Sequence, residues 1–578
     1  MANLFNSVRG LHPRKNAFNK SYRNTFTTSM GKLVPVFLQD CVPGTTIRCG
    51  ASGLIRFQAL LAPIMDNVNC YVHFWKIPYR LLDSDFPKWI GNEIADEEYD
   101  PPYVTGYALS DAASGLSNSN IWSPGSLLDY LGYPSGLSDN RNLKLNIRPI
   151  QAYGLLLKHW YTNENFGSTD LVEAVDALLD AHGESSSQVV AFFGALENMG
   201  CQDQLFNHAW AKDYFTSALP SVQAGDPVTL GIAGSAPVTI PANQDFAVGP
   251  GTGGNIQVNA SGTSGTGDKN LFVQDNSNTS TTGPLMVASG STGAKVNRIT
   301  GKTVGALTGT TDLSDATAVT INELRVANSL QVFKERLMRF GHRYVEYLRG
   351  FFNVTSSDAR MQLPEWLGGG KMPINIADVE QTSATSNSAV SGANTPQGNL
   401  AGKGTGFSGG FAGFKTYCEE ECIVIGLMYV QPKASYCQGV SRFLTKLNDR
   451  YDYFNPSFEH LGEQEIKNYE LYADEFSGSN PSLETFGYTP RYAEYRFHND
   501  ETHGQFKSTL NFWTLTRIFA GEPALNPKFI YTQPEALRRI FAVEKVGDDY
   551  IDNLLCDFYF NVQVVQPVSK YGTPMLLN

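Results

Sequence analysis

The sequence predicts a mainly β protein whose strands form a sandwich, with helices confined to long connections. Only 17% of the 578 residues are charged, while Gly, Pro and Tyr are abundant at 54, 29 and 27. This composition indicates strands, long loops and much buried surface. Short apolar runs alternate with turns that contain Pro or Gly. Residues 554–564 alternate apolar and polar side chains, which is typical of a strand with one buried face.

Charge and cysteine content argue against several classes of protein. The net charge of −12 is unfavourable for a surface that coats nucleic acid throughout. The eight cysteines contain no C-x-x-C pair, which favours free thiols in a reducing cytoplasm over a disulfide framework. No apolar stretch typical of a signal peptide or of a membrane span is found. We therefore expect a protein that is made and assembled inside a cell.

Residues 1–32 are predicted to form a basic N-terminal arm, because their charged residues are all Lys or Arg. Aromatic residues lie between these charges, so the arm could contact phosphates and stack on bases. An arm that is solvated or docks on the protein fits the composition equally well. The candidates for facing DNA are Arg9, Arg14, Lys15, Lys20 and Arg23.

Residues 33–215 are predicted to form the first part of the β domain. Apolar or alternating runs at 33–38, 54–61 and 70–77 predict its first strands. Short helices follow in a long connection. One is predicted to be capped by Ser123 and stopped by Gly132, and another covers residues 170–181.

Residues 216–320 differ from the rest of the chain and are predicted to be a surface insertion. They are rich in Gly, Ser and Thr, and their only aromatic residues are Phe246 and Phe272. Short β-prone pieces, 228–232, 238–240, 255–259 and 285–288, lie between turn residues. A disordered tract would be more charged, so we expect a small folded β insertion.

Residues 321–578 are predicted to complete the β domain. A capped amphipathic helix is expected from about residue 320 to 341. Residues 375–410 are expected to be a Ser-, Asn- and Gly-rich loop. The continuous apolar run 422–430 predicts a buried strand, and 554–564 predicts the last strand of a sheet.

No motif indicates catalysis, a cofactor or a metal. Residues 404–409 match G-x-G-x-x-G, but they do not follow a predicted strand, so a flexible loop is preferred to a dinucleotide site. His498 and His503 lie near acidic residues in a segment that is more typical of a surface loop than of a metal site. The acidic runs 96–98 and 419–421 are expected to be solvated or to lie at interfaces.

Several stretches together resemble the major capsid protein of the Microviridae, small single-stranded DNA phages, and in particular the gokushovirus branch. They occur in the family's order over most of the chain outside the insertion. The stretches are Ser21–Phe26, Gly31–Pro35, Asn67–Leu82, Ile321–Glu346, Asp358–Gln362, Glu365–Gly369, Gly398–Gly404, Phe486–Arg496 and Phe512–Trp513.

The resemblance implies an eight-stranded antiparallel jelly roll of the viral coat type, with sixty copies in a T=1 icosahedral shell of the virion. It implies pentamers and trimeric contacts between copies, and assembly in the host cytoplasm. The implied partners are an internal scaffolding protein, a minor pilot protein, a small basic DNA-binding protein, the single-stranded DNA genome and a host surface receptor. It further implies that residues 216–320 cluster at the threefold axes as protrusions, for which the candidate residues are Phe246, Asn255, Ile256 and Phe272.

Two alternatives come from other classes of protein. A carbohydrate-binding or adhesin-like β-sandwich would explain a Gly- and Thr-rich module, but it predicts a secretion signal. A polysaccharide-cleaving enzyme would need two carboxylates about 5–9.5 Å apart in a cleft, a separation that sequence does not reveal. The capsid hypothesis is preferred because it also explains the basic arm and the lack of a catalytic motif.

Overall fold

The computed structural model divides the chain into two units, Met1–Asp226 with Val332–Asn578, and Pro227–Gln331. The residues that it describes are 14–90, 94–95, 97–105, 121–134, 143–163, 165–166, 169–225, 236–240, 307–311, 321–340, 363–380, 382, 385–386, 394–395, 400–447, 449–473, 483–546 and 549–570.

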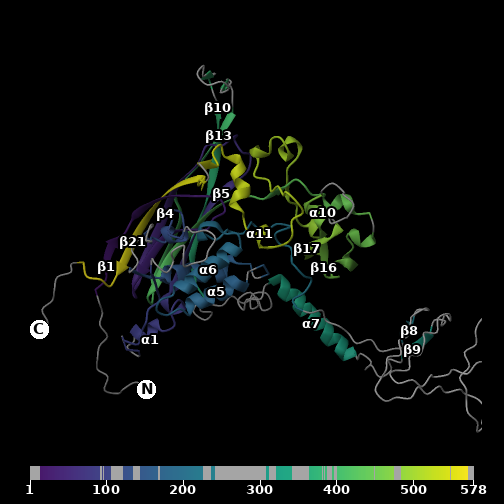
Figure 1. Cartoon of the computed structure of the whole chain (residues 1–578), viewed down its shortest axis with the longest axis horizontal. Helices are drawn as coiled ribbons and strands as arrows, with labels where there is room; N and C mark the ends of the chain where they lie inside the picture. Colours follow the sequence, from purple (N-terminus) through teal and green to yellow (C-terminus); the bar gives the residue numbers. More distant parts are fainter. Residues whose placement is uncertain are drawn as a thin grey trace, which may run out of the picture. The chain divides into compact units, whose positions relative to one another are not determined.

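The first unit is built around one antiparallel sheet (Figure 1). Its neighbours run in the order β1-β21-β4-β13-β10-β5-β14-β3, with β2 also paired to β21. The strands are β1 (Asn16–Asn19), β2 (Tyr22–Thr28), β3 (Val34–Cys41), β4 (Thr45–Phe57), β5 (Val68–Pro78), β10 (Glu365–Glu380), β13 (Leu400–Cys418), β14 (Cys422–Pro432) and β21 (Leu554–Gln566). The prediction of a mainly β protein with antiparallel strands is therefore confirmed.

The pairing of the long strands is nested. β2 pairs with β21, β3 with β14, β4 with β13, and β5 with β10. Among the eight strands from β2 to β21, the first therefore pairs with the last, the second with the seventh, and so on inward. Additional pairings of β21 with β4, β14 with β5 and β10 with β13 join these pairs into one sheet.

The sheet curls so that its two ends come together around an aromatic core. Phe37 of β3 lies with its ring centroid 5.3 Å from that of Phe560 in β21. The side chain of Asn24 in β2 donates a hydrogen bond of 2.9 Å to the carbonyl of Val36 in β3. Phe37 also contacts Phe74 in β5, at 5.8 Å. One continuous core inside the curl therefore contains side chains from strands at both ends of the sheet order.

The burial of side chains along β21 follows the alternation in its sequence. Leu554, Cys556, Phe558, Phe560, Val562 and Val564 are buried, whereas the residues between them are exposed or half-buried. Successive side chains of a strand point to opposite faces, so the period of two marks a face against the core. The predicted strands at 33–38, 70–77 and 422–430 are also confirmed, as parts of β3, β5 and β14. The run 54–61 is a strand only to Phe57, where β4 ends. This strand begins earlier than predicted, at Thr45.

The predicted loop at 375–410 is wrong for the segments that the structure describes next to its two ends. Residues 375–380 and 400–405 pair as arms of β10 and β13, and the short strands β11 (Thr385–Ser386) and β12 (Asn394–Thr395) pair beyond them. The G-x-G-x-x-G stretch 404–409 lies within β13. Glycine is disfavoured in strands, which explains the wrong prediction. At Gly404, however, a Cβ would lie 2.6 Å from the ring of Phe57, so only glycine fits under this side chain.

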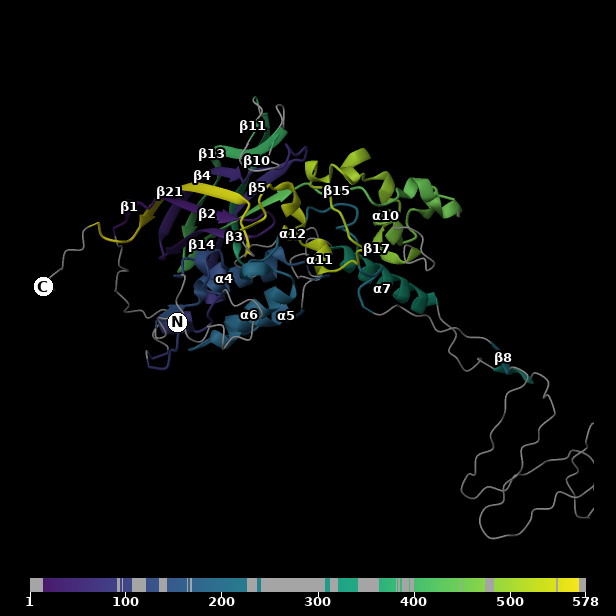
Figure 2. The same ribbon diagram turned by 45° about the horizontal axis from the view of Figure 1, so that its top comes forward.

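The connection between β5 and β10 contains helices that cover one side of the sheet (Figures 1 and 2). Tyr153 in α4 donates a hydrogen bond of 2.9 Å to the carbonyl of Leu33, beside β3. The described elements between β5 and the second unit are η1 (Tyr79–Leu81), α1 (Phe86–Ile90), β6 (Tyr103–Thr105), α3 (Leu127–Tyr130), β7 (Lys144–Asn146), α4 (Arg148–Leu156), the π-turn η3 (Leu157–Tyr161), α5 (Thr169–Leu179), α6 (Ser186–Asn198) and η4 (Gln202–Gln204).

Both helices predicted in this connection are found. α5 corresponds to the helix predicted at 170–181 and buries Leu171, Val175 and Leu178. α3 corresponds to the helix predicted before Gly132, which has a φ of +89° and ends it. The predicted cap at Ser123 is wrong, because Ser126 accepts the hydrogen bond from the backbone N–H of Asp129.

The connection between β14 and β21 consists mostly of single turns and short strand pairs. The elements are β15 (Ser435–Tyr436), η5 (Arg442–Thr445), η6 (Arg450–Asp452), η7 (Pro456–Phe458), β16 (Glu463–Lys467), α10 (Asn468–Leu471), β17 (Thr485–Pro490), η9 (Ala493–Tyr495), β18 (Asp500–Glu501), η10 (Gly504–Lys507), η11 (Asn511–Trp513), α11 (Pro527–Ile530), α12 (Pro534–Leu537), η12 (Arg538–Ile540), β19 (Lys545–Val546) and β20 (Asp549–Tyr550).

The second unit contains an antiparallel strand pair, β8 (Ala236–Ile240) with β9 (Leu307–Thr311). β8 contains the β-prone piece predicted at 238–240. The pieces predicted at 228–232, 255–259 and 285–288 lie outside the described residues. Helix α7 (Ile321–Phe340) matches the predicted helix, and the division into units falls within it. No helix in the described part of the chain is long and apolar enough to cross a membrane.

Candidate assembly and binding surfaces

The basic residues near the N-terminus do not form a detached arm where the structure describes them. β1 and β2 both pair with β21 and extend the sheet. Strong backbone pairing explains this docking, because β21 would otherwise be an unpaired edge. Residues 16–28 therefore fit the docking alternative, whereas residues 1–13 lie outside the described part of the chain.

The five candidates for facing DNA differ in their surroundings. Arg9 lies outside the described residues. Arg14 and Lys15 are exposed, and the Lys15 ammonium lies 5.0 Å from the ring centroid of Tyr417. Lys20 is half-buried. Arg23 is exposed but pairs with Asp557 of β21, and this pairing lowers the pKa of the Asp557 carboxyl.

The four candidates for the protrusion, Phe246, Asn255, Ile256 and Phe272, lie outside the described residues. Before and after these residues in the sequence, the pairing of β8 with β9 brings Ile240 directly opposite Leu307. The chain therefore enters and leaves the segment 241–306 at one place.

An apolar patch lies on the connection between β14 and β21. Two short stretches, 443–454 and 495–497, contribute to it. They meet where the ring centroid of Phe454 lies 6.3 Å from that of Tyr495, and where the Lys446 ammonium lies 3.9 Å from the Tyr495 ring centroid. The patch consists of Phe443, Leu444, Leu447, Tyr453, Phe454, Tyr495 and Phe497, all of which are exposed.

The exposure of this apolar patch is unusual for an isolated protein. Phe443 is 76% exposed and Leu447 is 84% exposed. Exposed apolar side chains gathered on one connection in this way mark sites of protein association. The sequence does not reveal the patch, because a run of aromatic residues does not show whether its side chains are inside or outside. The density of aromatic residues from Tyr451 to Phe454 was the available signal.

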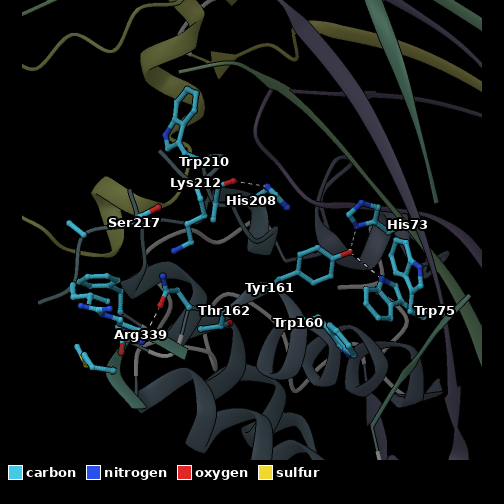
Figure 3. A pocket seen from close by; sticks show the side chains of 18 residues that line it. His73, Trp75, Trp160, Tyr161, Thr162, His208, Trp210, Lys212, Ser217 and Arg339 are labelled. Carbon is cyan, nitrogen blue, oxygen red and sulfur yellow. Dashed lines mark hydrogen bonds between the residues drawn. The ribbon is translucent and has the colours of Figure 1, made fainter. Parts of the chain in front are cut away.

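A second feature is an aromatic cleft between β5, the π-turn η3 and the segment around His208 (Figure 3). Its volume is about 740 Å³. The π-turn widens the end of α4 and directs Trp160 and Tyr161 toward β5. The ring centroid of Trp75 lies 4.7 Å from that of Trp160 and 4.8 Å from that of Trp366.

Hydrogen bonds fix the inner wall of the cleft. The hydroxyl of Tyr161 points between His73 and Trp75 (Figure 3). It lies 2.9 Å from His73 Nδ1 and accepts a hydrogen bond of 3.1 Å from Trp75 Nε1. Burial lowers the pKa of His73 to about 4 and that of His208 to about 4. Both imidazoles are therefore neutral at pH 7.

The positive groups at the cleft already have partners. The Lys212 ammonium donates a hydrogen bond of 3.3 Å to the carbonyl of Thr216, and Arg339 pairs with Glu463. The walls of the cleft are flat aromatic rings, and two of these rings belong to half-exposed tryptophans. Little unpaired positive charge is present among the described residues of the cleft to bind a phosphate. Such walls suit the packing of a ring or an apolar side chain.

The histidines that were considered as metal ligands lie on the surface. His498 and His503 both approach Glu501, with Nε2 at 3.7 and 3.1 Å from its carboxylate oxygens. Their side chains are 81% and 73% exposed. This arrangement agrees with the prediction of a surface segment. Within the acidic run 419–421, Glu420 pairs with Arg80 at 2.9 Å.

The eight cysteines are free and buried, and three of them meet. Cys41, Cys418 and Cys422 have sulfur atoms that all lie within 4.8 Å of one another. The thiols of Cys41 and Cys422 donate to the sulfur of Cys418, which lowers the pKa of Cys418. The sequence does not reveal this cluster, because Cys41 is remote in sequence and the spacing of Cys418 and Cys422 is not that of a C-x-x-C pair.

Comparisons with known proteins agree with one another. The family described as capsid protein (F protein) matches residues 6–576. Capsid protein VP1 of Bdellovibrio phage phiMH2K is 32% identical over 99% of this chain and 97% of its own length. Capsid protein VP1 of Chlamydia phage 1 is 31% identical over 100% and 98%. Capsid protein VP1 of Spiroplasma virus 4 is 28% identical over 99% and 97%.

Proposed function

The chain belongs to the phage capsid protein (F protein) family, and on that premise we propose that sixty copies assemble into a T=1 icosahedral shell around a single-stranded DNA genome. Membership makes the protein a major capsid protein of the microvirid type, a component of the virion with a structural rather than an enzymatic role.

The subunit core is proposed to be an eight-stranded jelly roll. The support comes from the nested pairing of β2 with β21, β3 with β14, β4 with β13 and β5 with β10. A long antiparallel hairpin that is rolled up has these pairs, and double-sheet jelly rolls of viral capsids are built in this way. The curl around Phe37 and Phe560 supports the same interpretation.

The observation that carries the assembly proposal is the apolar patch at 443–454 and 495–497. Its occupant is proposed to be a second copy of this chain. A subunit that stayed monomeric would leave Phe443 and Leu447 in water at 76% and 84% exposure, and burial of such side chains drives association. In a closed shell every copy buries the same patch, so the gain is repeated around the whole particle.

The insertion is proposed to form threefold protrusions that contact the host receptor. The support is that β8 and β9 bring both ends of residues 241–306 together, so the segment can leave the subunit and return without disturbing the sheet. Replacement of 241–306 by a short turn should leave shells intact but abolish protrusions and infectivity. Failure of the shortened chain to assemble would contradict the proposal.

The N-terminal basic residues are proposed to face the genome, although their charge is too small to neutralise it. A small basic DNA-binding protein is therefore a proposed partner, together with an internal scaffolding protein and a minor pilot protein. Deletion of the N-terminal residues would also remove β1 and part of β2. Replacement of the charged side chains is therefore the better experiment. Arg9, Arg14, Lys15 and Lys20 changed to Gln should lower the DNA content of particles more than their yield. Unchanged DNA content would assign these residues to docking.

Electron microscopy of the purified protein, expressed with its scaffolding protein, tests the assembly proposal directly. Closed shells or pentamers are expected. The adhesin-like alternative predicts instead a stable monomer that binds glycans, and that result would overturn the proposal.

A further inference from the structure

We propose that Cys41, Cys418 and Cys422 form a binding site for a thiophilic metal ion such as zinc, which cross-links three strands at one end of the sheet. The three residues come from different strand ends. Cys41 ends β3, Cys418 ends β13 and Cys422 begins β14. This site is independent of the surfaces that carry the assembly proposal.

The geometry of the three sulfur atoms fits one ion. Zinc binds thiolates at about 2.3 Å in a tetrahedral arrangement, which places two thiolates on one ion roughly 3.8 Å apart. The sulfur atoms of the cluster all lie within 4.8 Å of one another, so binding requires them to move inward by about 1 Å at most. Side-chain rotation alone can supply a movement of this size.

The backbone holds the three side chains on one site. Cys41 and Cys422 are direct partners in the pairing of β3 with β14, and directly opposite residues project to the same face of a sheet. Cys418 is brought in by the tight connection 419–421 between β13 and β14. All three residues are at most 2% exposed, so the sulfur atoms are shielded from bulk water and oxidants.

The surroundings provide a fourth position and a balancing charge. Thr45 is the direct partner of Cys418 in the pairing of β13 with β4, so its side chain lies on the same face. Its buried hydroxyl has no hydrogen-bond partner among the described residues. A water that completes the coordination of the metal would satisfy it. The Lys76 ammonium lies 3.5 Å from the carbonyl of Tyr417, beside Cys418, and also pairs with Glu365, so it offsets only part of the negative charge of three thiolates.

The choice of metal follows from the ligands. Thiolate sulfur selects soft or borderline ions such as Zn²⁺ and Cu⁺ over Mg²⁺ and Ca²⁺, which prefer oxygen. A site closed by strand ends, without an open face toward a cleft, is typical of a structural rather than a catalytic ion. The ion would tie β3 and β14 to β13, which belong to opposite parts of the sheet order.

Metal analysis of the purified full-length chain tests the site. The wild-type protein, loaded with zinc and freed from loosely bound ion, should retain about one zinc per chain, and Cys418→Ser should retain little. Cys437→Ser is the matched control, because Cys437 is also free and buried but lies outside the cluster. Buried thiols are alkylated only after local opening, so in mild urea zinc should slow the alkylation of Cys41, Cys418 and Cys422, mapped by mass spectrometry, but not that of Cys437.

Cobalt gives a second measurement that needs only the wild-type chain. Co²⁺ bound by three thiolates should give an intense near-ultraviolet charge-transfer band, which zinc should displace. The proposal fails if the wild-type chain binds no zinc, if Cys418→Ser binds as much as the wild type, or if the purified chain carries a disulfide between Cys41 and Cys422. The cobalt and protection experiments decide the question even where Cys418→Ser does not fold.

Discussion

Leu447→Glu should prevent shell assembly without unfolding the subunit. Leu447 is 84% exposed in the subunit, and full burial of a leucine side chain contributes about 2 kcal/mol. Loss of this contribution weakens each contact through the patch by roughly 30-fold. A glutamate forced into an apolar interface adds the cost of removing its charge from water, so the value of about 2 kcal/mol is a lower bound.

The assay is the concentration at which subunits form particles, measured by light scattering and checked by electron microscopy. Unfolding of the subunit should be unchanged, since a substitution at an exposed position usually alters stability by less than about 0.5 kcal/mol. Leu447→Met is the matched control, because it keeps an apolar side chain of similar volume, and it should assemble normally. Particles formed by Leu447→Glu at wild-type concentrations would refute burial of the patch between copies.

Two further predictions concern stability. Gly404→Ala should destabilise the subunit by about 2 kcal/mol in a urea titration, through overpacking against the Phe57 ring. Gly409→Ala should be neutral in the same titration, because a Cβ there meets nothing within 4 Å. Equal effects of the two substitutions would mean that residues 404–409 behave as a loop. Acid should also destabilise the subunit, because burial lowers the pKa of His73 and His208 to about 4, so the unfolded chain takes up protons first as the pH falls below about 6.5. Stability should therefore fall between pH 6.5 and 4, by about 3 kcal/mol for each ring, and urea titrations of His208→Gln should show a smaller fall than those of the wild type.

Local patterns were sufficient where one element lies against one core. The alternation in residues 554–564 predicted which face of β21 is buried, because the side-chain period of a strand depends only on backbone geometry. The apolar positions of α5 were equally informative. Family-like stretches along the chain predicted the capsid family, which the comparisons confirmed.

Local sequence patterns gave wrong predictions where the folded backbone decides which residue fits a position. The glycines of β13 predicted a loop, whereas Gly404 is required because the Phe57 ring of β4 covers it. The helix cap was placed at Ser123, although Ser126 is the residue whose hydroxyl reaches the first turn. Ser123 and Ser126 are both suitable capping residues, and only the folded backbone distinguishes between them.

The sequence by itself therefore determined the β class, the strands with clear alternation, the free thiols and the family. Tertiary structure alone decided which residues meet: the nested strand pairs, the aromatic cleft, the exposed patch around Leu447 and the cluster of Cys41, Cys418 and Cys422. The physical reason is that periodicity and capping are properties of neighbouring residues, whereas exposure and clustering depend on contacts between strand ends that lie far apart in the chain.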